Sequence, residues 1–343
     1  MSAGDRERIS VVDYKQVHDE AIVFDGTCPL LTHSPEHTSY YVEGGVTVVA
    51  PSLAANHNCG EAIMRIADWL NIIREHSREL MHVTDIEGFF QAKAEDRLGI
   101  LFHFQNSLPL EQSIELVDVY HALGVRVIQL TYNVRNFVGD GCLEPNDAGL
   151  SAFGRRLIKA MNRAGIAVDC SHTGIQTTLD AMDVSEQPVV FSHNLAKGVC
   201  DSPRNLTDEQ IKRVAEMGGV IGINGFPPFV AKKRRPTLDD LLKHVDHIAD
   251  LVGIDHVGIG IDFEYIGDSM QEASKAHYDY FVKSGQWDPK DYPPPPYYYP
   301  QGLDDPRCFP NLTRALLERG YDEAETKKVL GGNFMRVYSQ IWT

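Results

Sequence analysis

The chain has 343 residues with 48 acidic and 32 basic side chains, so its formal net charge is −16. A negative charge of this size argues against nucleic acid and anionic membrane surfaces as partners. Hydrophobic residues make up 43% of the chain and charged residues 23%, as is ordinary for globular proteins, and no apolar run is long enough to span a bilayer.

Residues 1–14 are polar and charged, without the apolar core of a secretory signal. The six cysteines are scattered along the chain and form no CxxC pair, which is typical of reduced thiols. These two features predict a cytoplasmic protein.

Short apolar runs alternate with longer helical patterns along nearly the whole chain. Continuous apolar strands that alternate with helices are typical of a parallel sheet covered by helices. Eight such strands fit a closed barrel better than an open sheet, so we expect a single α/β domain over 1–343, a (β/α)8 TIM barrel. The expected strands are 21–25, 45–50, 98–104, 125–130, 166–170, 188–192, 219–223 and 256–261. The expected helices are 60–78, 110–122, 150–163, 175–184, 207–217, 237–252, 312–319 and 322–330.

One segment, 264–311, interrupts this alternation after the last strand. It contains prolines at 293–296 and tyrosines at 297–299, and it is too long for an ordinary βα loop. Its aromatic content is unlike that of disordered segments. We expect an ordered insertion over the mouth of the barrel. Alternatively, the segment contacts a second copy of the chain in a homodimer, or wraps the surface away from the substrate.

Two neighbouring strands of this barrel end in the dipeptide Ser-His. His172 follows strand 166–170 and His193 follows strand 188–192. The carboxyl ends of neighbouring parallel strands meet, so the two imidazoles are expected to converge. Converging neutral imidazoles are typical of a divalent-metal site. The alternative is two unrelated histidines that hydrogen-bond to loops.

Other polar residues are expected at the same end of the barrel. Asp262 follows the last strand, where its carboxylate can exchange a proton at an attacked carbonyl; alternatively it caps a helix or anchors a loop. Arg204 lies in the loop after strand 188–192, where its guanidinium can bind a substrate carboxylate; alternatively it is an ordinary surface arginine. Tyr132 and Asn133 end the fourth strand.

A series of short motifs runs through the chain in a specific order and spacing. Together they resemble the membrane (renal) dipeptidase family of zinc metallopeptidases, which belongs to the amidohydrolase-like barrels. The motifs are Leu123–Arg126, Leu130–Asn133, Gly154–Arg155, Met161–Gly165, Asp169–His172, Phe191–His193, Arg204–Asp208, Gly218–Val220, Gly258–Phe263, Pro310–Leu312 and Gly332–Phe334.

The resemblance implies a binuclear zinc site. One metal is bound by a His-x-Asp pair after the first strand and by a bridging Glu after the third. The second metal is bound by that Glu and by two histidines, which correspond to His172 and His193. The family's general acid/base corresponds to Asp262 and its carboxylate-binding arginine to Arg204, while a substrate-facing histidine corresponds to Tyr132.

The sequence departs from the family at several of these positions. Thr27 and Pro29 replace the His-x-Asp pair, and Gln105 replaces the bridging Glu. A neutral amide brings no charge to offset the repulsion between two dications. We therefore expect at most one divalent ion, zinc, held by His172 and His193 with Gln105 as a weak ligand. His103, two residues before Gln105, is expected deeper in the barrel.

These residues predict a metal-dependent hydrolase that cleaves a dipeptide or a dipeptide-like small amide with a free carboxylate. Two alternatives remain open at this point. The barrel is catalytically impaired or repurposed and binds a small carboxylate ligand, or it is another amidohydrolase-type enzyme that opens a lactone or a cyclic amide.

Overall fold

Parallel strands form a nearly closed barrel at the centre of the computed structural model, which describes residues 13–342. The barrel strands pair in the order β1-β2-β5-β6-β7-β8-β9-β10, and every pair is parallel. The Gly26 amide donates to the Ile259 carbonyl at 2.9 Å, which links the first strand to the last. The predicted (β/α)8 TIM barrel is confirmed. Its strands are β1 (Phe24–Asp25), β2 (Val48–Val49), β5 (Leu98–Phe104), β6 (Val125–Gln129), β7 (Ala167–Asp169), β8 (Val190–Asn194), β9 (Val220–Ile223) and β10 (Val257–Ile259).

All eight expected strands overlap an observed barrel strand. Two further strands, β3 (Ser52–Ala54) and β4 (Leu80–Val83), pair with β5 beside the barrel path and were not predicted. Each has at most four residues, and β4 follows a long helix with no glycine or proline between them. Hydrophobic periodicity cannot separate so short a strand from the preceding helix.

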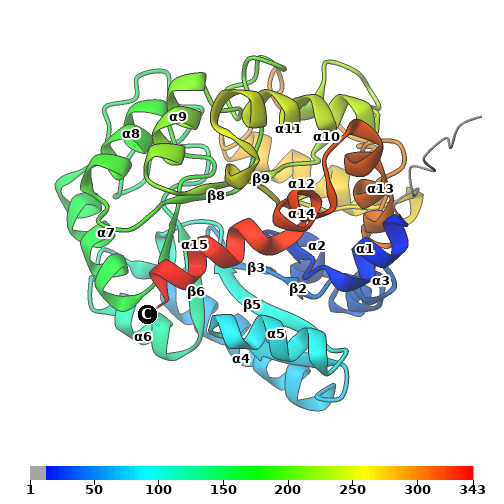
Figure 1. Cartoon of the computed structure of the whole chain (residues 1–343). Helices are drawn as coiled ribbons and strands as arrows, with labels where there is room; N and C mark the ends of the chain where they lie inside the picture. The colour runs from blue at the N-terminus through cyan, green and yellow to red at the C-terminus, as the bar shows by residue number, and fades with distance from the viewer. Residues whose placement is uncertain (1–12, 343) are drawn as a thin grey trace, which may run out of the picture.

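Helices surround the barrel on its outer side (Figure 1). Several begin at side chains that accept hydrogen bonds from the first turn, as in the capping box of Thr207 and Gln210. Helix α8 has the bounds that the sequence predicts. The described α-helices are α1 (Tyr14–Glu20), α2 (Pro29–His33), α3 (Thr38–Glu43), α4 (Cys59–Glu75), α5 (Ile86–Ala94), α6 (Leu116–Ala122), α7 (Ala152–Ala164), α8 (Ile175–Val184), α9 (Asp208–Glu216), α10 (Pro227–Val230), α11 (Leu238–Val252), α12 (Gln271–Lys283), α13 (Phe309–Arg319), α14 (Glu323–Lys327) and α15 (Asn333–Ile341).

Helix α15, which the sequence did not predict, covers the amino-terminal end of the barrel. In Figure 1 it crosses in front of the strands as the red C-terminal helix. Its apolar face packs against inward-facing residues from the starts of the strands, and together they form a second hydrophobic core. That face consists of Phe334, Val337, Tyr338 and Ile341. Because this end is sealed, ligands must enter at the carboxyl ends of the strands.

The segment 264–311 contacts those carboxyl ends. It contains α12 and an aromatic pair, in which Trp287 stacks on Tyr292 with ring centroids 4.5 Å apart. Trp287 Nε1 donates a hydrogen bond to the Tyr132 hydroxyl, just after β6, at 3.2 Å. The segment is therefore anchored at the end of the barrel where the polar residues gather.

None of the described helices is long and apolar enough to cross a lipid bilayer. The polar N-terminal stretch that argues against a secretory signal lies outside the described residues, apart from Asp13 and Tyr14.

Candidate functional site

The two Ser-His motifs bring their imidazoles together, as the sequence predicts. His172 follows β7 and His193 lies within β8, and their Nε2 atoms are 2.8 Å apart. Both side chains are buried, His172 being 4% exposed and His193 0%. Burial, with a contribution from the nearby Arg204 charge, lowers the pKa of both rings well below the usual value. The rings are therefore neutral, which is the form that binds metal ions.

Hydrogen bonds fix the tautomer of His193. The Ser192 hydroxyl donates its one hydrogen to Asp169 Oδ2 at 2.5 Å, so toward His193 Nδ1 at 2.7 Å it can only accept. Burial alone would raise the pKa of Asp169. The hydrogen bonds that its carboxyl accepts, with His103 making the largest contribution, outweigh the effect of burial and hold that pKa below its usual range. The proton of neutral His193 is thus on Nδ1, and its Nε2 carries a lone pair.

Asn133 fixes the tautomer of His172 in the same way. Its Nδ2 atom donates to the Gln286 carbonyl at 3.1 Å, which turns its Oδ1 toward His172 Nδ1 at 2.7 Å. An amide oxygen only accepts, so His172 carries its proton on Nδ1. The Nε2 lone pairs of the two histidines therefore point at each other.

Facing lone pairs at this distance need a cation or a shared proton between them. Two nitrogens bound to one tetrahedral zinc lie about 3.3 Å apart, because Zn–N bonds are about 2.0–2.1 Å. The Nε2 atoms of His172 and His193 are 2.8 Å apart, so a small increase in this distance would match that geometry. Each ring also has an orienting partner on its other nitrogen, as metal-binding histidines usually do. The two histidines fit a divalent metal.

The family positions for a second metal do not fit one. The Thr27 hydroxyl is buried against the Ser52 hydroxyl at 3.1 Å, and Pro29 begins α2. Gln105 directs its Nε2 atom at His193 Nε2, 3.4 Å away, so its oxygen could face that nitrogen only after the amide rotates. Within residues 13–342 there is no group of three or more His, Cys, Asp or Glu side chains that could hold a metal.

His103 lies below the site, as expected. Its Nε2 atom is 3.3 Å from Asp169 Oδ2, and both side chains are fully buried. Hydrogen bonds through Asp169 and Ser192 thus connect it to His193.

Asp262 faces the pair from the end of the last barrel strand, β10. Its Oδ2 atom lies 4.0 Å from His193 Nε2 and accepts a hydrogen bond from Asn224 at 3.2 Å. Burial, with the nearby Glu264 charge, raises the pKa of Asp262 to about 8. Burial alone raises the pKa of Glu264 to about 8. Sequence reasoning missed Glu264, although its position two residues after Asp262 could have indicated it.

Three of these residues have left-handed backbone. The φ angles are +60° at Asn133, +59° at His172 and +64° at Asp262. This conformation is uncommon for residues other than glycine and tends to cluster at functional sites. Its occurrence at three converging side chains supports a functional role for the cluster.

Arg204 is buried beside the histidines rather than exposed in its loop. It is 2% exposed, its Nη2 atom donates to the His193 carbonyl at 3.2 Å, and its guanidinium lies 5.4 Å from the centre of the Phe229 ring. Its Nε and Nη1 atoms have no hydrogen-bond partner in the described part of the chain. A buried guanidinium with two unused donors is suited to an anionic ligand.

Tyr132 occupies the position of the family's substrate-facing histidine. Its ring stacks on His172 with centroids 4.3 Å apart and an interplanar angle of 22°. Its neighbour Asn133 also contacts the Tyr292 hydroxyl, at 2.9 Å. Both residues thus hold His172 in place and connect it to the segment 264–311. The sequence did not indicate the roles of Trp287 and Tyr292, which depend on how this segment folds.

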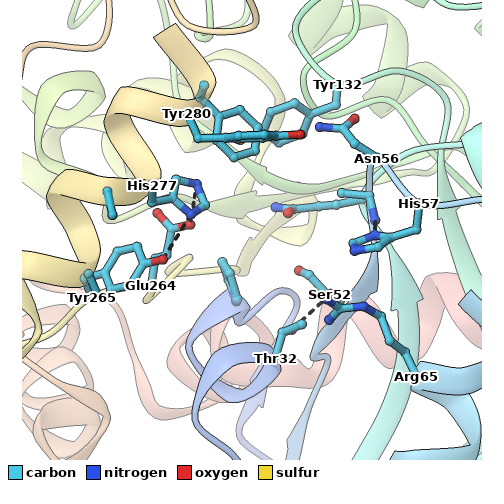
Figure 2. A pocket seen from close by; sticks show the side chains of 16 residues that line it. Thr32, Ser52, Asn56, His57, Arg65, Tyr132, Glu264, Tyr265, His277 and Tyr280 are labelled. Atoms are coloured by element: carbon cyan, nitrogen blue, oxygen red, sulfur yellow. Dashed lines mark hydrogen bonds and ion pairs between the residues drawn. The ribbon is translucent and has the colours of Figure 1, made fainter. Parts of the chain in front are cut away.

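Two connected cavities lie above the site. A small one, of about 20 Å³, is bounded by His172, Asp262 and the aromatic pair of Trp287 and Tyr292. A larger one, of about 500 Å³, shares four lining residues with it and is also lined by side chains of α12 and by Arg65 of α4 (Figure 2). The shared residues are Pro29, Gln105, Tyr132 and Glu264. A volume of about 500 Å³ is in the range typical of small-molecule sites.

A sequence model of the membrane dipeptidase family, peptidase family M19, matches residues 16–280 and 295–343. The chain belongs to this family. An uncharacterized dipeptidase of Schizosaccharomyces pombe is 34% identical over 230 residues, which are 66% of this chain and 49% of that protein. The chain spans about half the length of the curated relatives it matches.

Solved structures share the fold of this chain. A crystal structure of an amidohydrolase from Pseudomonas aeruginosa has a TM-score of 0.87 and 32% identity, with 96% of this chain and 99% of that chain covered. A metallo peptidase from Rhodobacter sphaeroides, solved with a phosphinate mimic of the dipeptide L-Ala-D-Ala, has a TM-score of 0.78, with 94% and 100% covered. The latter is 21% identical and therefore supports the fold alone.

Proposed function

We propose that this chain is a metal-dependent hydrolase that cleaves a dipeptide or a dipeptide-like small amide. The observation that carries the proposal is the pair of unprotonated Nε2 atoms, of His172 and His193, that face each other at 2.8 Å. Membership of the membrane dipeptidase family supports the same reaction. The 34% identical relative from Schizosaccharomyces pombe, which is named a dipeptidase, supports a dipeptide as the class of substrate.

One divalent ion, zinc, would be held by His172 and His193, with Gln105 as a third and weaker ligand. The positions Thr27 and Pro29 offer no imidazole or carboxylate for a second ion. A divalent cation supplies Lewis acidity that polarises an amide carbonyl and activates water.

The remaining residues act directly on the substrate. Asp262, which lies at the histidine pair, acts in its ionised form: it accepts a proton from the attacking water and returns that proton to the leaving amine. Arg204 binds the substrate carboxylate through its two free donors. Tyr132 and Asn133 hold His172 in position and form part of the substrate wall.

The segment 264–311 acts as an ordered insertion over the mouth of the barrel. Its Trp287 and Tyr292 rings cover the small cavity above His172. In this position they exclude bulk water from the reacting amide, which strengthens the electrostatic interactions within the site.

A second candidate function is a repurposed barrel that binds a small carboxylate without cleaving it. The observation that favours it is the incomplete ligand set, since no third His, Cys, Asp or Glu joins His172 and His193 in the region the structure describes. The free donors of Arg204 would then hold the ligand. A cytoplasmic location and a homodimer contact through the segment 264–311 stay predictions.

Hydrolysis of a panel of dipeptides and N-acyl amino acids separates the two functions. We expect chelator-treated protein to be inactive, zinc to restore amine release, and His193→Ala to abolish it. Thr27→Ala serves as the matched control and should keep activity. Absence of turnover with zinc, combined with tight binding of the same carboxylates, would support the repurposed barrel instead.

A further inference from the structure

The outer cavity of about 500 Å³ has one cationic side chain on its wall whose charge is not used elsewhere. Arg65 comes from α4 and extends its guanidinium toward the cavity, beside Ser52 and Thr32 (Figure 2). It forms no hydrogen bond or ion pair with any residue that the structure describes.

Arg65 points toward the cavity although acidic residues lie near it on the same helix. Glu61 lies four residues before it on the same helix and Asp68 three residues after it, which are the spacings of helical ion pairs. Glu61 is instead occupied by the capping box, where it accepts the Asn58 amide at 2.9 Å. Arg65 thus faces the cavity although acidic neighbours are within reach along its helix.

His57 adds a second donor at this end of the cavity. Its Nδ1 atom accepts the Ala55 amide at 3.0 Å, so in the neutral ring the proton is on Nε2. Burial, helped by the Arg65 charge, lowers the pKa of His57, which keeps the ring neutral. The two side chains together offer hydrogen-bond donors to an anion.

The acidic residue on the cavity wall does not compete with that anion for Arg65. Glu264, on the opposite wall, already pairs with His277 at 3.1 Å. Apolar groups also line the cavity, among them Ala273, Ala276 and Phe281 of α12. A ligand with an apolar body and an acidic end would match this distribution.

We propose that the outer cavity is a specificity pocket in which Arg65, assisted by His57, binds an acidic side chain of the substrate. This inference rests on the proposed hydrolase function, because the outer cavity connects to the histidine pair through Gln105 and Tyr132. The preferred substrates are then dipeptides or N-acyl amino acids that carry a second carboxylate. The α-carboxylate goes to Arg204 and the side-chain carboxylate to Arg65.

Calorimetric binding of two matched probes tests the pocket without requiring catalysis. N-acetyl-L-glutamate and N-acetyl-L-glutamine share the α-carboxylate and differ in side-chain charge. We expect chelator-treated full-length protein to bind the glutamate probe about tenfold more tightly, as a charge-assisted hydrogen bond at a partly exposed site allows. Arg65→Gln should remove this difference, and Arg65→Lys should keep part of it.

Arg74→Gln is the control, because Arg74 lies on the same helix, is exposed and does not line the cavity. Equal affinity of wild-type protein for the two probes, or an unchanged preference in folded Arg65→Gln protein, would overturn the pocket.

Kinetics with Ala-Glu against Ala-Gln, and Glu-Ala against Gln-Ala, separate this inference from the hydrolase proposal. Turnover without a preference for the acidic member of either pair refutes the pocket and leaves the hydrolase intact. A glutamate preference in binding that depends on Arg65, without turnover of any dipeptide, refutes hydrolysis and leaves the pocket intact.

Discussion

Ser192 is the residue at which the tautomer argument can be tested most sharply. Its hydroxyl donates to the buried Asp169 carboxylate at 2.5 Å and accepts from His193 Nδ1 at 2.7 Å. Ser192→Ala removes a hydrogen bond to a charged group, which is worth about 1.5–3 kcal/mol. It also leaves a buried N–H without an acceptor, at a cost of about 1–3 kcal/mol. The two effects overlap, so we expect a loss of about 3 kcal/mol in the free energy of unfolding.

The matched control is Ser274→Ala. The Ser274 hydroxyl is also buried, but it has no hydrogen-bond partner among the described residues. Its removal should therefore cost little. Urea unfolding of chelator-treated protein measures both changes, provided that the slope with denaturant is unchanged.

Ser192→Ala should also weaken zinc binding about 10–100-fold, because the orienting partner of a metal-binding histidine is lost. The reasoning is refuted if Ser192→Ala destabilises the protein no more than Ser274→Ala and binds zinc with wild-type affinity.

Three further predictions concern pH, catalysis and packing. Burial lowers the pKa of His244 to about 4 from 6.5, so the stability contributed by the neutral ring is complete above about pH 6.5 and is lost as the pH falls toward 4. His244→Gln should therefore flatten the decline of unfolding free energy between pH 7 and pH 4.5, and parallel wild-type and variant profiles would contradict this. Asp262→Asn should lower kcat about 10²–10⁴-fold with a normal fold by circular dichroism, and wild-type turnover would remove Asp262 from the mechanism. Gly260→Ala places a Cβ atom 1.8 Å from the Ser192 carbonyl oxygen, a backbone atom that cannot move aside, so we expect a loss of more than about 3 kcal/mol or insoluble protein. Gly60→Ala, where the nearest atom is 3.4 Å away, should be tolerated, and equal melting temperatures for the two variants would show that the contact is not decisive.

The sequence predicts the barrel well because its strands are unambiguous. Buried parallel strands are continuous apolar runs, and each of the eight expected runs overlaps a barrel strand. Helix α15 was predictable too, since Phe334, Val337, Tyr338 and Ile341 have helical spacing, but the predicted elements end at residue 330. The short strands β3 and β4 lack a periodic signal of their own.

The convergence of His172 and His193 was also predictable, because parallel strands end at the same edge of a barrel. The groups that surround the two histidines were harder to predict from the sequence. Trp287 and Tyr292 reach the site from a long segment whose path the sequence does not determine. Arg65 lies on an ordinary amphipathic helix, and only its tertiary surroundings show that it faces a cavity.

Zinc titration by calorimetry, with chelator-treated wild-type protein, tests the central claim most directly. The facing Nε2 atoms of His172 and His193 predict one zinc ion per chain, lost in His193→Ala and retained in Thr27→Ala. Binding of two ions, or of none, or a single ion that His193→Ala leaves unchanged, would contradict the account.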